Sequence, residues 1–451
     1  MLRSLLSSVL IVSVAAAAPA GLHPVVSEAV ALVSESNIKE TLRELAEFGT
    51  RNTNTDGAIK ASRWIHAKLA SYSPRLKVRY DAWRVKKKGR IVKDIDLVNV
   101  VAVLPGRTHA ERQVIVSGHY DSIVSRPGEG DTEPISPETS AAAPHAPGVS
   151  DDASGVAAVM ELARVMSHFE FEKTLVFIAF SGEEQGLVGS SLYAARAMES
   201  KEVLEAVLNN DIIGNDRAGN GVVASHTVRL FSGDPADSPS RALARFVHAT
   251  AARYIPAMKV DLIFREDRFA RGGDHTPFHA AGFPAVRFTT AAEALDLQHT
   301  AGDTLENASP AYAARVARVN AAAMASLGLA PIAPEVTRII PSRDGTRPAA
   351  PGPDLSRGKS RYEAVMKWKA PDADPNRSGF AVVVRSTLAP LWEREIPTGD
   401  IRELTLKDFS IDDVVLGVKA TGPYGLESPV AAYVMVPFGR QTWDAKPVTT
   451  P

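Results

Sequence analysis

Acidic residues and histidines follow apolar runs of the chain, and both residue types bind metal ions. Glu183 and Glu184 come just after the apolar run from Thr174 to Phe180, and His119 follows a second run, Val114–Val116. Short apolar runs of this kind predict buried strands. Ligand-binding groups gather where strands end in open α/β sheets, so we expect these side chains to contribute to one site.

Further acidic residues and one histidine lie at comparable places. Asp121 follows two residues after the first histidine, on the same side of an extended chain. Asp151 and Asp152 open a predicted helix, Asp211 follows Leu-Asn-Asn, and His299 lies in a polar loop. Each strand or helix end therefore supplies at least one group that could bind a cation.

These residue types match the requirements of metal-assisted hydrolysis. Such a reaction needs cations that polarise a carbonyl, a bound water that loses its proton, and a base that accepts it. One short carboxylate can bridge two cations ~3.5–4 Å apart, while histidines and other carboxylates fill the outer positions. The residues therefore predict a two-metal site that uses water to hydrolyse an amide bond.

Each motif taken alone also has an ordinary structural explanation. Asp152 fits a helix N-cap, His119 and Asp121 fit a turn after a strand, and adjacent glutamates are commonly a solvated pair. A loop histidine such as His299 is commonly a surface residue. The combination of all of them in one chain favours the metal site.

Composition narrows the classes of function. The chain has 451 residues, 45% hydrophobic and 23% charged, with a net charge of −1, and this length allows two domains. A near-zero charge without a basic stripe excludes nucleic acid as a partner. The sequence contains no cysteine, which excludes disulfides, thiolate zinc ligands and cysteine nucleophiles.

The first residues have the pattern of a secretory signal peptide. An apolar stretch runs from Leu5 to Ala18, and small residues that fit a cleavage site follow it. We predict a signal peptide over residues 1–20 and a secreted or periplasmic mature protein. No later segment has the length of a membrane span.

The remaining pattern predicts an α/β fold followed by an all-β region. Apolar strands alternate with helices up to a helix at Ala311–Leu327, which favours a mostly parallel mixed sheet covered by helices on both faces. The predicted strands are Leu76–Trp83, Leu97–Leu104, Val114–Val116 and Thr174–Phe180, and the predicted helices are Ser36–Phe48, Ala58–Ala70, Ala153–His168, Leu187–Met198 and Glu199–Val207. Beyond about residue 333, short alternating segments separated by Pro, Gly and Asp predict a β-sandwich.

Longer motifs then give the chain a family resemblance. The motifs are His119–Asp121, Gly148–Gly155, Ser181–Gly186, Asp211 and Gln298–Thr304. Together they resemble the secreted di-zinc aminopeptidases of the M28 family, over roughly residues 35 to 328. The resemblance implies the zinc exopeptidase fold over residues 21–332 and peptide substrates.

The resemblance also implies a set of metal ligands. Asp151 would bridge two Zn²⁺ ions, His119 and Asp211 would complete one site, and Glu184 and His299 would complete the other. A donor set of two imidazoles and three carboxylates without sulfur suits zinc, with Co²⁺ or Mn²⁺ as alternatives.

By the same resemblance, Glu183 is the general base, and Asp121 and Asp152 support the ligands from behind. Working as a base, Glu183 would take a proton from water and return it to the leaving amine.

The segment Gly272–Pro284 resembles the part of the family that lines the substrate pocket, with Asp274 and His275 as structural or pocket residues. Relatives often place an aromatic hydroxyl nearby to stabilise the oxyanion. Here the nearest preceding aromatic residue is Phe269, which has no hydroxyl, so Arg268 or Arg271 is the expected substitute.

Three segments are expected to shape the pocket: Ser122–Val149, Phe264–Phe269 and Ala291–Gln298.

The C-terminal region resembles a fibronectin type III domain over residues 333–437, with Trp368 in its core and a flexible tail at 438–451. It carries no catalytic motif. We expect it to dock on the peptidase or to bind an extracellular surface or polymer.

Other functions are compatible with the same residues. Relatives with a similar site include zinc carboxypeptidases and glutaminyl cyclases, so the preference for the amino end rests on the resemblance alone. A protein with a decayed site that serves adhesion is the non-enzymatic alternative, but the intact ligand set argues against it.

Overall fold

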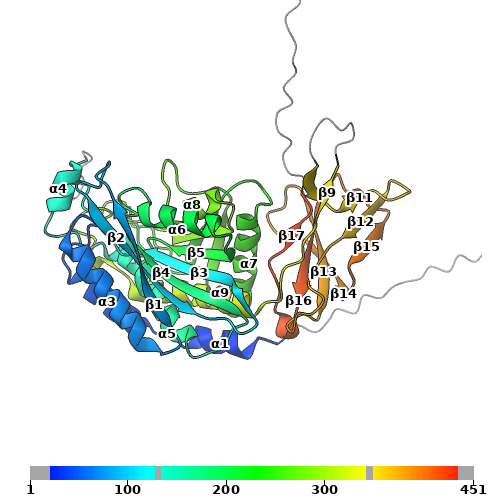
Figure 1. Ribbon diagram of the computed structural model, residues 1–451, viewed down its shortest axis with the longest axis horizontal. Coiled ribbons are helices and arrows are strands. Elements are labelled where there is room, and N and C mark those ends of the chain that lie inside the picture. The colour runs from blue at the N-terminus through cyan, green and yellow to red at the C-terminus, as the bar shows by residue number, and fades with distance from the viewer. Residues whose placement is uncertain (1–20, 127–133, 342–348, 435–451) are drawn as a thin grey trace, which may run out of the picture.

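The computed structural model describes residues 21–126, 134–341 and 349–434. The predicted signal peptide, the predicted tail and residues 127–133 of the predicted Ser122–Val149 loop lie outside these ranges. Figure 1 shows an α/β part beside a β-rich part formed by the C-terminal residues.

A mixed sheet of eight strands forms the centre of the α/β part, in the order β1-β2-β4-β3-β5-β8-β6-β7. The four central strands, β4, β3, β5 and β8, run parallel, while β2 and β6 flank them in the opposite direction. The strands are β1 (Lys77–Val85), β2 (Ile95–Leu104), β3 (His109–His119), β4 (Lys173–Phe180), β5 (Val203–Asn210), β6 (Thr227–Ser232), β7 (Lys259–Ile263) and β8 (Ala285–Thr290). The predicted mostly parallel mixed sheet is confirmed.

Helices cover both faces of this sheet (Figure 1). One face packs against α1 (Pro24–Ala31), α2 (Glu35–Ala46), α3 (Asp56–Tyr72), α5 (Ser154–Met166), α7 (Pro239–Tyr254) and α9 (Pro310–Leu329). The other face packs against α6 (Val188–Glu199) and α8 (His275–Ala280), and the short helix α4 (Pro137–Ala142) lies in the loop after β3. Among the described helices, none is both long and apolar enough to cross a membrane.

The central strands are buried on both faces, as their apolar runs predict. All eight residues of β4 are buried, and alternate side chains belong to different cores. Leu175 and Phe177 pack with the large helical layer, whereas Val176 and Ile178 pack toward α6 and α8. This double burial fixes the strand ends, where the motif residues lie.

One predicted helix is wrong. The sequence pattern predicts helix over Glu199–Val207, but β5 begins at Val203 and inserts between β3 and β8. A short apolar run does not distinguish strand from helix by its periodicity. Glu205, a residue common in helices, instead pairs with Lys173 on β4 and Arg112 on β3.

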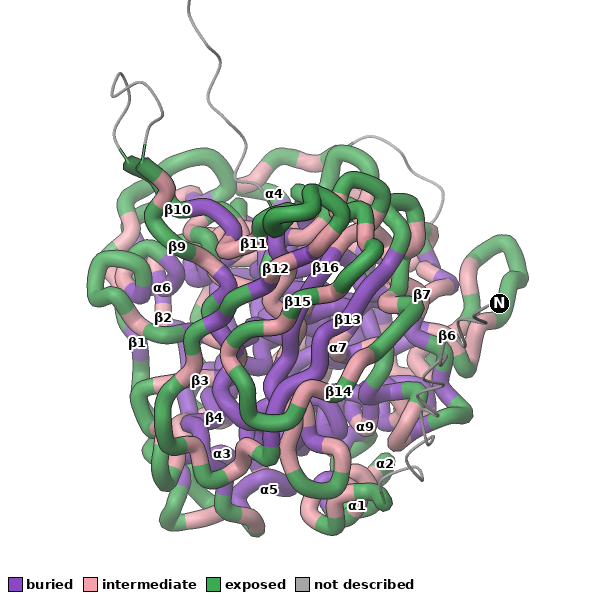
Figure 2. The backbone as a smooth tube through the Cα atoms, turned by 90° about the vertical axis from the view of Figure 1, so that its right-hand side faces the viewer, coloured by how far each residue is buried: buried purple, intermediate pink, exposed green. Residues whose placement is uncertain are grey.

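The C-terminal region consists of antiparallel sheets, which confirms its all-β class. A three-stranded and a four-stranded sheet enclose a core in which the rings of Trp368 and Phe380 lie 5.7 Å apart. Figure 2 shows these sheets in front of the α/β part. The strands are β9 (Thr337–Ile340), β10 (Ala350–Pro353), β11 (Leu355–Ser356), β12 (Glu363–Lys367), β13 (Gly379–Ser386), β14 (Arg394–Gly399), β15 (Glu403–Lys407), β16 (Val414–Thr421) and β17 (Ala431–Ala432).

The β-rich region docks on α7 of the α/β part. Arg245 donates to the carbonyl of Pro390 at 2.7 Å, and Arg253 donates to the carbonyl of Gly425 at 2.7 Å. Arg385 also forms an ion pair with Asp237. These contacts agree with the expectation that the region docks on the peptidase.

A buried arginine joins the loops that lead into the motif residues. The guanidinium of Arg51 donates to the carbonyls of Leu45 (3.0 Å), Tyr120 (2.6 Å), Pro147 (2.6 Å) and Gly148 (2.9 Å). Burial lowers the pKa of Arg51 to about 10, so it remains charged at neutral pH. This one side chain ties the residue after His119 to the segment before Asp151.

We predict that Arg51→Met lowers the free energy of unfolding by about 3 kcal/mol or more, because four carbonyls lose the buried guanidinium that donates to them. Urea denaturation measures the change. Arg63→Met, on the exposed face of α3, is the matched control and should change stability by less than about 0.5 kcal/mol. Equal stability of the two variants would contradict the structural role of Arg51.

Candidate metal centre

All the predicted ligands lie beyond the carboxyl ends of the parallel strands. His119 is the last residue of β3, Asp211 follows β5, and Glu184 follows β4. Asp151 lies in the turn Val149–Ala153 that precedes α5, where the Asp151–Asp152 peptide bond is cis. His299 lies in the loop after β8.

Asp151 lies between the two imidazoles. Its Oδ1 is 3.2 Å from Nε2 of His119, and its Oδ2 is 3.1 Å from Nε2 of His299. The two oxygens of one buried carboxylate thus face two different histidines. This is the arrangement expected of a carboxylate shared by two cation positions.

Each histidine also faces a second carboxylate. Oδ1 of Asp211 lies 3.8 Å from Nε2 of His119, and Oε1 of Glu184 lies 3.2 Å from Nε2 of His299. The five residues therefore form two groups of three that have Asp151 in common.

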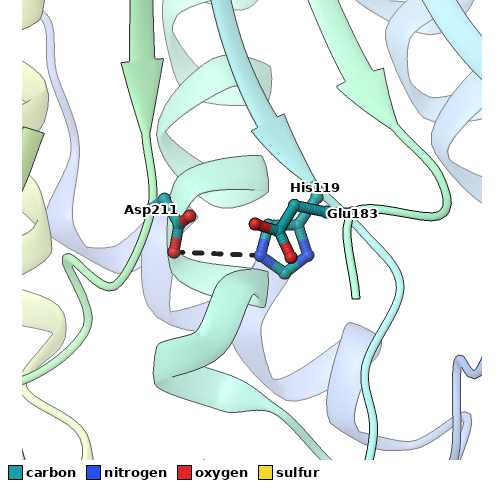
Figure 3. A group of neighbouring side chains, drawn as sticks. All are labelled: His119, Glu183 and Asp211. Atoms are coloured by element: carbon teal, nitrogen blue, oxygen red, sulfur yellow. Dashed lines mark ion pairs between the residues drawn. The ribbon is translucent and has the colours of Figure 1, made fainter. Parts of the chain in front are cut away.

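Glu183 occupies the open side of this cluster. Figure 3 shows its carboxylate and that of Asp211 directed at the space around the His119 ring. Ligand atoms of these three residues lie within 4.8 Å of one another, as do those of His119, Asp151 and Glu184. The cavity above the cluster has a volume of about 420 Å³. It is lined by Arg90, Asp151, Glu183, Glu184, Gly186, Leu187, Asp211, Arg268, Ala270, Arg271, Gly272 and His299.

Two buried atoms indicate that the cluster fits cations. Within the described part of the chain, Nε2 of His119 and Oε1 of Glu184 are buried and accept or donate no hydrogen bond. Buried polar atoms are normally satisfied. Nε2 of His119 lies 3.2 Å from Asp151, and Oε1 of Glu184 lies 3.2 Å from Nε2 of His299, so a metal ion at each of these two positions would supply the missing partner.

The electrostatics of the cluster also favour bound cations. Burial acts to raise the pKa of Asp151, but the imidazoles of His119 and His299 hold it well below its usual range. Burial acts to lower the pKa of His299, yet Glu184 and Asp151 raise it to about 10. Crowded carboxylates thus require positive charge, which protons or divalent cations can supply.

Asp121 contacts the cluster through both its backbone and its side chain. Its backbone carbonyl, rather than its carboxylate, lies within hydrogen-bonding distance of Nδ1 of His119, at 3.1 Å against 3.7 Å. The carboxylate instead accepts from the backbone N–H groups of Gly182 (2.9 Å) and Glu184 (3.1 Å). Asp121 thereby fixes the loop that presents both glutamates.

Asp152 joins the ends of three elements. Its carboxylate accepts from the backbone N–H groups of His119 (3.1 Å), Gly155 (2.8 Å) and Ile212 (3.2 Å). Asp152 lies one residue before Ala153, the N-cap of α5, but its carboxylate still accepts from the N–H of Gly155 in the first turn of that helix.

Asp303, at the end of a motif but without a predicted role, fixes the bridging residue. Its carboxylate accepts from the backbone N–H groups of Ser150 (2.8 Å) and Asp151 (3.0 Å). Burial raises its pKa to about 7.

Arg287 is a buried counter-charge that the sequence did not reveal. It lies 3.0 Å from Oδ1 of Asp211 and 2.6 Å from Oδ2 of Asp267. Burial acts to raise the pKa of Asp211, and Arg287 is the main cause of its lowering. A single arginine within the apolar run of β8 was the only signal in the sequence.

The residues considered for binding the oxyanion differ in whether they line the cavity. Phe269 is 85% exposed and does not line the cavity, whereas Arg268 and Arg271 both line it. Asp274 and His275 are buried outside the cavity lining, in agreement with a structural role.

Comparison with known proteins identifies a family and several relatives that are similar to this chain. The model of peptidase family M28 matches residues 99–324. A probable zinc metalloprotease of Pyrenophora tritici-repentis is 33% identical over 451 residues, covering 90% of this chain and 96% of the relative. Another, from Pyricularia oryzae, is 35% identical over 437 residues, covering 88% and 82%.

Solved structures share the fold. LapB from Legionella pneumophila has a TM-score of 0.53 at 21% identity and covers 68% of this chain and 75% of its own. The LapA aminopeptidase of the same organism has a TM-score of 0.52 at 21% identity, covering 67% and 74%. A glutaminyl cyclase from Bacteroides thetaiotaomicron has a TM-score of 0.51 at 14% identity, covering 65% and 97%.

The match to the family and its relatives defines the class of the protein as a peptidase, a hydrolase of peptide bonds. The chain belongs to peptidase family M28.

We predict that Arg287→Met lowers the free energy of unfolding by about 3–5 kcal/mol, because Asp211 loses its buried counter-charge and Asp267 keeps only Arg268 of its two arginine partners. Arg287→Met combined with Asp267→Asn should recover part of the loss. Denaturant titration of both variants measures it. A single variant as stable as the parent would show that Arg287 does not compensate these carboxylates.

Proposed function

We propose that this protein is a secreted, zinc-dependent aminopeptidase that removes residues from the amino end of peptides. The observation that carries the proposal is the carboxylate of Asp151, which lies 3.2 Å and 3.1 Å from two imidazoles. The relatives described as probable zinc metalloproteases support the metal. The fold shared with the LapA aminopeptidase is compatible with the direction of cleavage.

In this proposal two zinc ions are held by the five clustered residues. Asp151 is shared, His119 and Asp211 complete one position, and Glu184 and His299 complete the other. Imidazole and carboxylate donors without sulfur suit zinc. When bound, the ions polarise the scissile carbonyl and lower the pKa of water.

The chain itself supplies the proton transfer. Glu183 stands beside the ligands at the cavity wall and is not needed to complete either group of three. Its carboxylate takes the proton from the attacking water and delivers it to the leaving amine. Because Asp121 holds the loop through Gly182 and Glu184, the base and the ligand beside it keep a fixed relation.

The flanking regions complete the proposal. Residues 1–20 act as a signal peptide that is removed on export, and residues 333–437 form a sandwich of the fibronectin type III kind. Binding of an extracellular surface or polymer by this sandwich stays a prediction without structural support.

We predict two zinc ions per chain, loss of activity on amino-acid anilides with chelator, and its return with zinc. Asp151→Asn should lower both zinc content and thermal stability, since metal binding adds to folding free energy. Asp413→Asn, an exposed change in the β-rich region, is the control for both measurements. One zinc per chain without hydrolysis would favour a cyclase, and unchanged zinc in Asp151→Asn would refute the bridge.

We predict that Glu183→Gln keeps the zinc content but lowers kcat by about 10²–10⁴-fold, because the amide cannot accept the proton. Steady-state kinetics together with metal analysis separate the two effects. Glu199→Gln at the exposed end of α6 is the matched control. Activity within about tenfold of the parent would remove Glu183 from the role of base.

A further inference from the structure

The mouth of the cavity is rich in arginine. Arg90, Arg268 and Arg271 line it together with the residues of the candidate metal centre. They come from two separate segments, since Arg90 lies in the turn between β1 and β2 and the other two lie between β7 and α8. The charge that each one presents to the cavity depends on its partners.

Arg268 is already neutralised. Its guanidinium lies 3.1 Å from Asp267 and 2.8 Å from Glu293, and its side chain is only 10% exposed. It is therefore held within the wall by two carboxylates, and it has little charge left to offer a ligand.

Arg90 has no such partner. It is exposed, and its Nη1 donates at 2.7 Å to the backbone carbonyl of Glu184. No carboxylate within the described ranges forms an ion pair with it. One hydrogen bond to a neutral acceptor thus orients the guanidinium beside the metal centre and leaves most of its donors open.

Arg271, on the segment between β7 and α8, is likewise held by a hydrogen bond to a neutral acceptor. It is exposed, and its Nη1 donates at 3.0 Å to the side-chain oxygen of Gln298, the residue before His299. Among the carboxylates that the structure describes, none pairs with it either.

The two hydrogen bonds place both arginines at the same half of the metal centre. Arg90 donates to the backbone of Glu184, and Arg271 donates to Gln298, the residue before His299. The side chains of Glu184 and His299 are themselves 3.2 Å apart. The described carboxylates that line the cavity are all members of the centre or its base, and Arg287 together with the proposed metal ions would compensate them. Among the described residues at this half of the mouth, the side-chain charges without an ion-pair partner are therefore the positive charges of Arg90 and Arg271.

We propose that Arg90 and Arg271 bind a carboxylate of the substrate, so that the enzyme prefers peptides with a negative charge next to the scissile bond. The inference rests on the proposed function and names its substrate class. The planar guanidinium is the group best suited to paired hydrogen bonds with a carboxylate. The carboxylate can come from an acidic amino-terminal side chain or from the free C-terminus of a dipeptide.

Two substrate pairs distinguish these sources. Glu-anilide against Gln-anilide tests the side chain, and Ala-Ala against Ala-Ala-amide tests the terminal carboxylate. In the parent enzyme kcat/KM should be higher for the charged member of one pair by roughly ten- to a hundredfold. This ratio should fall as ionic strength rises, because the mouth is exposed.

Arg90→Gln and Arg271→Gln should each bring the ratio in that pair toward one. Lys88→Gln removes a neighbouring exposed cation that does not line the cavity, and it should leave the ratio as it is. Urea denaturation curves that match the parent's show that each variant is folded.

Ratios near one for both pairs in the parent would overturn the inference while leaving the peptidase intact. An equal fall of kcat for charged and neutral substrates in Arg271→Gln would also overturn it for that residue, and would assign Arg271 to the oxyanion instead. Absence of hydrolysis of all four substrates by the zinc-loaded enzyme would refute the proposed function itself.

Discussion

The position of one buried carboxylate controls the geometry of the whole site. Asp151 touches both histidines, so any shift of its side chain would change both groups of ligands at once. The fold holds it from behind through its own backbone, which donates to Asp303. The preceding turn is held by Arg51, which donates to the carbonyl of Gly148. Because the side chain of Asp151 is short and the backbone around it is held at two points, its carboxylate keeps a fixed position between the two histidines.

The second constraint is charge. Carboxylates that face a shared space repel one another in a buried environment, so their proximity needs compensation. Behind Asp211 this compensation is a chain of alternating charges, from Arg287 to Asp267 and on to Arg268. On the cavity side no described lysine or arginine forms an ion pair with the carboxylates of the cluster, and in the proposed function metal ions would supply the positive charge there. The arrangement explains why the ligands face one way and the arginine the other.

The sequence predicted the residues of the cluster and missed those that hold it. Glu183 and His119 follow apolar runs rich in β-branched and aromatic residues, which favour buried strands, so their chemistry and their place could be inferred together. Arg51 and Arg287 are single charged residues within a polar loop and a strand, and their role depends on carbonyls and carboxylates distant in sequence. The error at β5 has a related origin, since its neighbours β3 and β8, rather than its own pattern, make it a strand. A local sequence pattern does not contain the information on which distant strands or side chains pair with one another.

The two arginines of the proposed charge selection lie in different parts of the chain, since Arg271 lies within the family match and Arg90 lies before it. The match to the peptidase family begins at residue 99, so it includes every proposed ligand and the base but not Arg90. Arg90 reaches the cavity from a turn between two antiparallel strands at the edge of the sheet, and among the described residues its guanidinium is held by a backbone carbonyl. A turn there can change its side chains without disturbing the strands that position the centre. The proposed charge selection can therefore be changed at Arg90 without altering the proposed ligands, because its described side-chain contact is with a backbone carbonyl and not with a ligand side chain.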